Sequence, residues 1–90
     1  MAKRDVDGYE LLANAIIVQA TKDYRSAYRR KLKFPHDRSA QGAMERIERF
    51  FRSGWYEMLT SLDGDMILQK VREMEEYEYA NGRGGAAEDA

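Results

Sequence analysis

Pro35 is the only proline among the 90 residues, and it divides a chain whose apolar residues otherwise recur every three or four positions. Valine, isoleucine and threonine are sparse, and no stretch keeps the two-residue alternation of a strand. Because proline disfavours helical geometry in the residue before it, the first helix should end at Phe34. The pattern predicts an all-α fold, a compact bundle of three to four helices.

The first helix is expected to run over residues 6–33 and is apolar on two neighbouring stripes. Tyr9, Leu12 and Ile16 begin one stripe, and the second consists of Leu11, Ala15 and Val18. A helix with one apolar stripe packs on one side only. Two stripes therefore indicate that this helix either lies at the centre of the domain or also meets another copy of the chain.

Capping residues divide the rest of the chain. Ser39 is the expected cap of a second helix, Ser53 could cap a short third helix over residues 55–62, and Asp63 precedes the last helix. Asn81 and Gly82 should end that helix. The prediction is a single helical domain, residues 1–81, followed by a flexible tail, residues 82–90.

The chain is short and lacks the usual stabilising crosslinks. It has no cysteine and one histidine, so disulfides and cysteine- or histidine-built metal sites are not expected. A chain of this size buries a modest fraction of its surface. Self-association is the remaining source of additional burial. We therefore predict a homo-oligomer without metal or cofactor.

The charge is unevenly distributed, although the net charge is only −1. From Lys22 to Arg52 there are ten lysines and arginines against four acidic residues, and from Gly54 to Ala90 there are three against nine. The acidic end is most simply a solvated face. It could also pair with the basic middle, which would weaken any hypothesis that the basic middle binds a ligand.

The basic middle interleaves cations with aromatic residues. Arginines form two parallel hydrogen bonds to phosphate, and tyrosines can stack on bases. There are two alternatives to ligand binding. Cations in the last turns of a helix interact favourably with the helix dipole, which would give them a structural role. A protein partner could also contact the same surface. The predicted ligand-binding residues are Lys22, Tyr24, Arg25, Tyr28 and Arg29, with Arg49 and Arg52 added if the second helix packs back antiparallel.

Large aromatic side chains cluster around the joint at Ser53 and Gly54. Their helical spacing is typical of a core, and some of the rings could instead line a ligand or partner surface. Because Trp55 and Tyr56 are adjacent, they point in different directions, and one of them should lie at the surface. The predicted interface residues are Phe51, Trp55 and Tyr56.

Several functions are not supported by any motif. The "LDGD" segment lacks the spacing and closing glutamate of a calcium loop, and no nucleophile elbow or glycine-rich phosphate loop occurs. A recognition helix at "WYEMLTSL" would carry one charge only, which is poor chemistry for a DNA groove. The longest apolar run, 15–18, is far short of a membrane span. We expect neither an enzyme nor a membrane or secreted protein.

Two segments, "AIIVQATKDYRSAYRR" and "IERFFRSGWYEMLTSLDGDMIL", give the chain a resemblance to small accessory proteins of phages and integrated mobile elements in Gram-positive bacteria. The shared pattern is "KDYR.A … IE.FFRS.WY..LT.LDG", over about residues 15–72. The resemblance carries no functional residues. It implies a cytoplasmic protein of the bacterial host cell that blocks a host machine or sequesters a nucleotide signal.

The residues and the resemblance together lead to three hypotheses. The first is a non-catalytic, anti-defence protein that binds an anionic, nucleotide-like immune signal of the host. The second is a protein-interaction module that inhibits or regulates a host or phage complex. The third is nucleic-acid binding, which would weaken steeply as the salt concentration rises.

Overall fold

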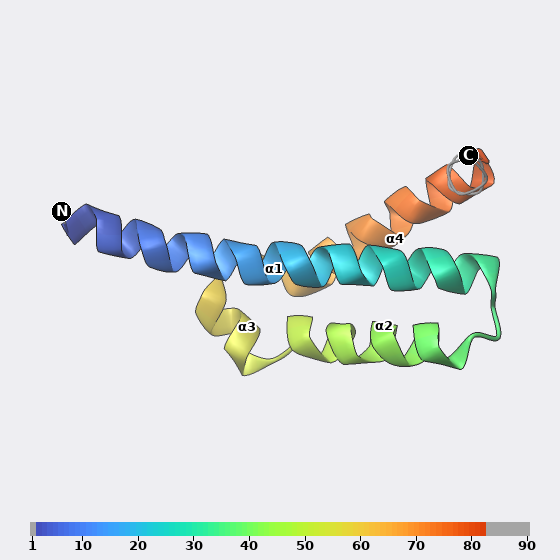
Figure 1. The fold of residues 1–90 in the computed structure, drawn as a ribbon, viewed down its shortest axis with the longest axis horizontal. Coiled ribbons are helices and arrows are strands. Elements are labelled where there is room, and N and C mark those ends of the chain that lie inside the picture. Colours follow the sequence, from blue (N-terminus) through green and yellow to red (C-terminus); the bar gives the residue numbers. More distant parts are fainter. Residues whose placement is uncertain (1, 83–90) are drawn as a thin grey trace.

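The computed structural model describes residues 2–82, and their side chains from residue 8 onward. It contains α1 (Ala2–Lys33), α2 (Arg38–Phe51), α3 (Gly54–Leu59) and α4 (Gly64–Ala80), shown in Figure 1. No strand occurs among the described residues. The predicted all-α bundle of three to four helices is confirmed. The expected tail lies outside the described residues, apart from Gly82.

The first two helices are separated where Pro35 predicts it, but their ends differ in detail. α1 starts at Ala2, four residues before the expected start. The cap of α2 is Asp37, not Ser39 as predicted. The Asp37 backbone is extended, and its side chain accepts a hydrogen bond from the Ala40 amide at 3.0 Å. Ser39 already lies in the first turn of the helix.

The two later caps follow the sequence prediction. The Ser53 hydroxyl accepts from the Tyr56 amide, and Asp63 accepts from the amides of Asp65 and Met66. α3 is shorter than predicted because Thr60 adopts an extended backbone, with φ −160° and ψ 158°. Gly82 has a φ of +77°, a conformation that favours glycine and that ends α4 sharply.

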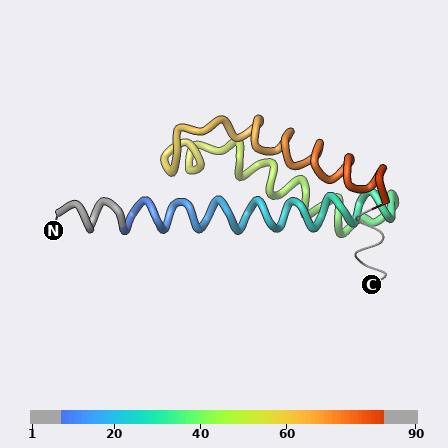
Figure 2. The backbone as a smooth tube through the Cα atoms, turned by 90° about the horizontal axis from the view of Figure 1, so that it is seen from above, coloured from blue at the N-terminus to red at the C-terminus, as the bar shows by residue number. Residues whose placement is uncertain are grey.

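α1 is the longest element and extends along the whole molecule. A 32-residue helix is about 48 Å long, which equals the longest dimension of the fold, 48 Å. α2 runs back antiparallel beside the C-terminal half of α1, and α4 packs on the same half from another side (Figures 1 and 2). α3 approaches the N-terminal half.

The core lies between α1, α2 and α4, and it is closed at one end by α3. Its fully buried side chains include two tyrosines as well as aliphatic residues. The core cluster comprises Ile17, Tyr24, Ala27, Met44, Phe51, Tyr56, Leu68 and Val71. Gly64 is also buried, where the start of α4 meets the end of α2. The core therefore positions the C-terminal half of α1 against α4.

Tyr56 gives a first testable prediction. Its ring is packed among Phe50 and Phe51, but its buried hydroxyl has no hydrogen-bond partner among the described residues. A buried hydroxyl without a partner carries a desolvation cost of about 1–3 kcal/mol. We expect Tyr56→Phe to leave stability unchanged or to raise it by up to about 1 kcal/mol. Urea unfolding followed by circular dichroism measures this, and a clear loss of stability would show that the hydroxyl is satisfied.

Candidate functional site

A buried carboxylate on α4 organises the basic segment of α1. Glu75 is 1% exposed. Its side chain accepts a hydrogen bond from Arg25 Nε at 2.9 Å and from Arg29 Nε at 2.9 Å, with Arg29 Nη2 at 3.3 Å. The acidic last helix therefore does pair with the basic middle. This pairing weakens the hypothesis that the basic middle binds a ligand, but because one carboxylate meets two arginines, the positive charge is neutralised only in part.

This arrangement keeps Glu75 ionised. Burial by itself raises the pKa of a carboxyl group, but the hydrogen bonds from Arg29 and Arg25 and their positive charges lower it. The pKa of Glu75 consequently lies below its ordinary value. Each arginine keeps about a third of its side-chain surface exposed, so the guanidinium groups are held in place and still reach solvent.

The two arginines line a small hollow on the outer side of α1. The hollow has a volume of about 210 Å³ and is lined by Lys22, Arg25, Ser26 and Arg29, which we call the basic hollow. Three of these four residues were predicted as ligand-binding from the sequence. Counting Glu75 beneath them, the formal charge is three positive minus one negative, or +2. A site of this kind suits an anion.

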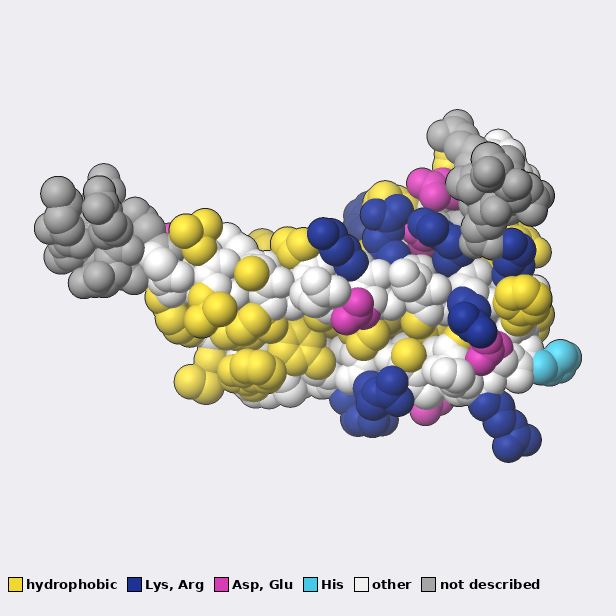
Figure 3. All heavy atoms as spheres, in the orientation of Figure 1, with side chains coloured by type: hydrophobic (Ala, Val, Ile, Leu, Met, Phe, Trp, Pro, Cys, Tyr) yellow, Lys and Arg dark blue, Asp and Glu magenta, His cyan; other side chains and the backbone are white. Residues whose placement is uncertain are grey.

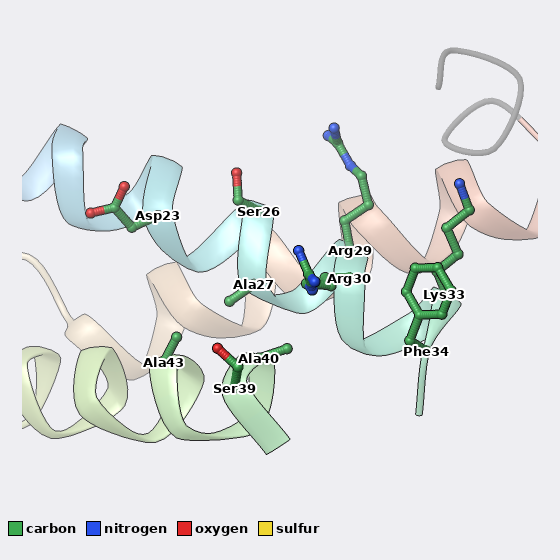
Figure 4. Close-up of a pocket in the computed structure, with 10 residues that line it drawn as sticks. All are labelled: Asp23, Ser26, Ala27, Arg29, Arg30, Lys33, Phe34, Ser39, Ala40 and Ala43. Atoms are coloured by element: carbon green, nitrogen blue, oxygen red, sulfur yellow. The ribbon is translucent and has the colours of Figure 1, made fainter. Parts of the chain in front are cut away.

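A larger groove adjoins the basic hollow, between the end of α1 and the start of α2. It has a volume of about 620 Å³ and shares Ser26 and Arg29 with the hollow. Figure 4 shows its floor of small side chains, Ala27, Ala40 and Ala43, with the Phe34 ring at one end. Ligand pockets are commonly about 300–1,000 Å³. The groove is therefore large enough for the body of a small ligand.

The prediction that Tyr24 stacks on a base is wrong. Its ring is 0% exposed. Its hydroxyl donates to Glu48 at 2.7 Å and accepts from Arg72 Nη1 at 3.0 Å. Burial, together with the hydrogen bond to Glu48, raises the pKa of Tyr24 to about 12. Tyr24 is a core residue with a satisfied hydroxyl.

Tyr28 is also occupied by contacts within the chain. Its ring stacks on Tyr24 with centroids 6.2 Å apart, and its hydroxyl donates to Glu76. Burial and this hydrogen bond raise the pKa of Tyr28 above its usual value. Tyr28 does not line the basic hollow or the groove. The exposed ring next to the cations is Phe34, which was predicted from the sequence only as the end of the first helix.

The predicted arginines of α2 are not brought to the basic hollow. α2 does pack back antiparallel, but Arg52 forms an ion pair with Asp65 at 2.8 Å. Arg49 lies exposed in the last turn of α2. Neither residue lines the hollow or the groove. Along the groove, Arg30 is the additional arginine, and it pairs with Asp37.

The predicted interface residues separate into exposed and buried ones. Trp55 is 56% exposed and packs edge-to-face on Phe50 at 5.5 Å, as expected for the one surface ring of the adjacent pair. Phe51 and Tyr56 are buried in the core. Their assignment to an interface is therefore wrong, because the protomer itself covers both rings.

Trp55 belongs to a larger apolar surface, which we call the apolar face. Figure 3 shows hydrophobic side chains gathered over the N-terminal half of α1 and over α3. The large side chains exposed here are Tyr9, Leu11, Leu12, Val18, Trp55 and Met58. Beside them an open groove of about 500 Å³ runs between α1 and α2. A concentration of exposed apolar side chains of this kind is typical of an interaction site.

Comparisons with known proteins identify no family for this chain. No protein-family model matches the chain, and no curated protein and no solved structure matches it. Among the described residues, no helix is both long and apolar enough to cross a membrane. The described part of the chain also contains no group of three or more histidine, cysteine or acidic residues placed to hold a metal ion.

Proposed function

We propose that the chain is a non-catalytic binding protein that holds an anionic ligand of nucleotide type on the outer side of α1. The observation that carries this proposal is the position of Glu75. A buried carboxylate holds Arg25 and Arg29 side by side, and both arginines line the basic hollow. Because these groups are already ordered, binding costs less side-chain entropy.

The shape of the site supports a ligand with two parts. The basic hollow, about 210 Å³, is below the usual size of a whole ligand pocket and suits a phosphate group. The adjoining groove can take the rest of the molecule, and Phe34 offers an exposed ring for stacking at its end. Together they fit a phosphate attached to an aromatic group.

The biological context of the proposal comes from the sequence resemblance. A small accessory protein of a phage or mobile element that binds a nucleotide can lower the concentration of a host signal simply by holding it. Such sequestration needs affinity and no catalytic group. In this proposal the protein acts in the cytoplasm of the bacterial host and serves an anti-defence role.

Lys22 provides the cleanest test of the ligand site. It is exposed, and no carboxylate among the described residues pairs with it, so its removal should not disturb the fold. We expect Lys22→Ala to weaken the binding of pyrophosphate, AMP and cyclic di-AMP about five- to tenfold, the effect of losing one charged contact. The measurement is thermal shift over a ligand series, since a ligand that binds only the folded state stabilises it by an amount that grows with the logarithm of its concentration relative to Kd.

Matched variants make this test specific. Lys70→Ala removes the same charge from an exposed position on α4 and should leave binding unchanged. Phe34→Ala should weaken the binding of AMP and cyclic di-AMP but not that of pyrophosphate. Equal binding by the Lys22 and Lys70 variants, or no stabilisation by any of the three anions, would contradict the proposal.

A second candidate function is favoured by the apolar face. The exposed Trp55 ring and the leucines of α1 are typical of protein–protein contacts, as in a module that inhibits or regulates a host or phage complex. A pull-down from host lysate that depends on Trp55 would support it. The two candidates use different ends of α1, so each can be tested without disturbing the other.

A further inference from the structure

The N-terminal half of α1 extends past the helices that cover its C-terminal half. Figure 1 shows α2 beside the later turns of α1, with α3 near the earlier ones. On the outer side of this half, Leu11 is 68% exposed and Leu12 is 60% exposed. Most helical stability in proteins comes from packing of an apolar face. An apolar stripe of this kind is therefore expected to be covered in solution.

The same surface also contains a groove that can receive such side chains. It is about 500 Å³ in volume and largely apolar. α1 contributes Ala15, Ile16, Gln19, Ala20 and Asp23, and the opposite wall is formed by Arg46, Ile47 and Phe50 of α2 with Trp55 of α3, so the end at Asp23 and Arg46 is polar. Leu12 lies one turn before Ile16 on the same side of α1. Projecting side chains and a groove thus lie next to each other on one face.

We propose that the apolar face binds a second copy of this chain, with the two α1 helices antiparallel and the two-fold axis near Ala15 and Ile16. This alignment places Leu12 at the level of the partner's Gln19, which lines the groove. By symmetry the partner's Leu12 lies beside the groove of the first copy. A two-fold interface uses the same patch on both subunits, and this patch is complementary to itself.

Side-chain size supports this position of the axis. Ala15 is exposed and small, so two helices crossing there can approach to about 8–10 Å. The same alignment places Asp23 opposite the partner's Gly8, which has no side chain. A Cβ at Gly8 would meet nothing within 4 Å, so this part of the surface is open. The polar end of the groove therefore meets no bulky group.

The distribution of charge also favours a second copy. Between Gly8 and Thr21 the only charged residue is Glu10, which lies on a different side of α1 from Ala15. Two copies can therefore meet without like charges facing each other. A stable interface buries about 800 Å² per partner, so the contact must include the walls of the groove as well as the six exposed apolar side chains.

The test is the oligomeric state of the full chain, measured by sedimentation at about 100 µM. We expect a dimer for the wild-type protein and a monomer for Ala15→Glu, which places two carboxylates at the axis. Because Ala15 is exposed on the protomer, helicity measured by circular dichroism should be retained. Met74→Glu makes a comparable change at an exposed apolar position of α4 and should remain dimeric.

Cysteine crosslinking tests the orientation, since the natural chain has no cysteine. We expect Ala15→Cys to form a disulfide-linked dimer under mild oxidation, and Met74→Cys not to. A mixture of Leu12→Cys and Gln19→Cys chains should give the mixed dimer if the helices are antiparallel, whereas parallel helices would give Leu12→Cys homodimers.

A wild-type monomer at this concentration, or a dimer that Ala15→Glu does not dissociate, would overturn the proposal and leave the apolar face to a foreign protein. Homodimers of the Leu12→Cys chain in place of the mixed dimer would overturn the antiparallel arrangement. Anion binding is independent of these outcomes, because the basic hollow is formed within one chain.

Discussion

Replacing Gly64 by alanine is expected to destabilise the fold by about 3 kcal/mol, at the upper end of the cost of overpacking a core. Gly64 is the first residue of α4 and lies against the last residue of α2. A Cβ there would lie well inside van der Waals contact with the Phe51 carbonyl oxygen and 3.2 Å from its carbonyl carbon. Both are backbone atoms, so the clash can be relieved only by moving α4 away from α2.

Gly42→Ala is the matched control for this substitution. Gly42 lies inside α2, and a Cβ there would meet only the Arg46 guanidinium at 3.7 Å. Alanine is favoured over glycine inside a helix by about 0.5–1 kcal/mol, so this variant should be more stable than the wild type. Urea unfolding measures both. Similar stabilities for the two variants would show that α4 does not approach Phe51 closely.

The second large effect is expected from Glu75→Gln. The glutamine keeps the size of the side chain but removes the charge that compensates Arg25 and Arg29. Removing one partner of a buried ion pair costs about 3–5 kcal/mol. The two arginines are about a third exposed, and solvent partly compensates them, so we expect about 3 kcal/mol. Glu73→Gln, on the same helix and exposed, should change stability by less than about 0.5 kcal/mol.

Acid should reproduce this loss in the wild-type protein. The pKa of Glu75 is lowered in the folded state, so its contribution to stability is present above the pKa of an unfolded glutamate, about 4.3. It is lost as the pH falls below that value towards the folded pKa. Unfolding free energies measured from pH 6 to pH 3 should therefore fall more steeply for the wild type than for Glu75→Gln. Parallel curves would contradict the assignment.

The helices could be predicted from local sequence because their boundaries depend on a few neighbouring residues. Pro35, Ser53 and Asp63 each mark a helix end through their own backbone or side-chain chemistry. The cap at Asp37 was missed because Ser39 is an equally good capping residue. Only the backbone angles of the folded chain distinguish the two.

The candidate ligand site was harder to predict because it depends on how distant helices pack. Tyr24 lies in the apolar stripe of the first helix, which predicts burial, and also in its basic segment, which predicts exposure to a ligand. A side chain on a helix points in one direction, so only one of these predictions could hold. The packing of α2 and α4 turns it inward. The link between Arg25 and Glu75 spans 50 positions, and the position of Phe34 beside the groove depends on the turn at Pro35. No periodicity in the sequence reports these contacts.

Under the proposed function, the anchoring of both guanidinium groups by Glu75 also sets when the protein becomes able to bind anions during synthesis. Arg25 and Arg29 are made 50 and 46 residues before the carboxylate that aligns them. A chain still on the ribosome, or a fragment that ends before residue 75, has the cations but not their alignment. Nascent and truncated products should therefore be poor scavengers of anions, and capture should begin only when translation has passed the last helix.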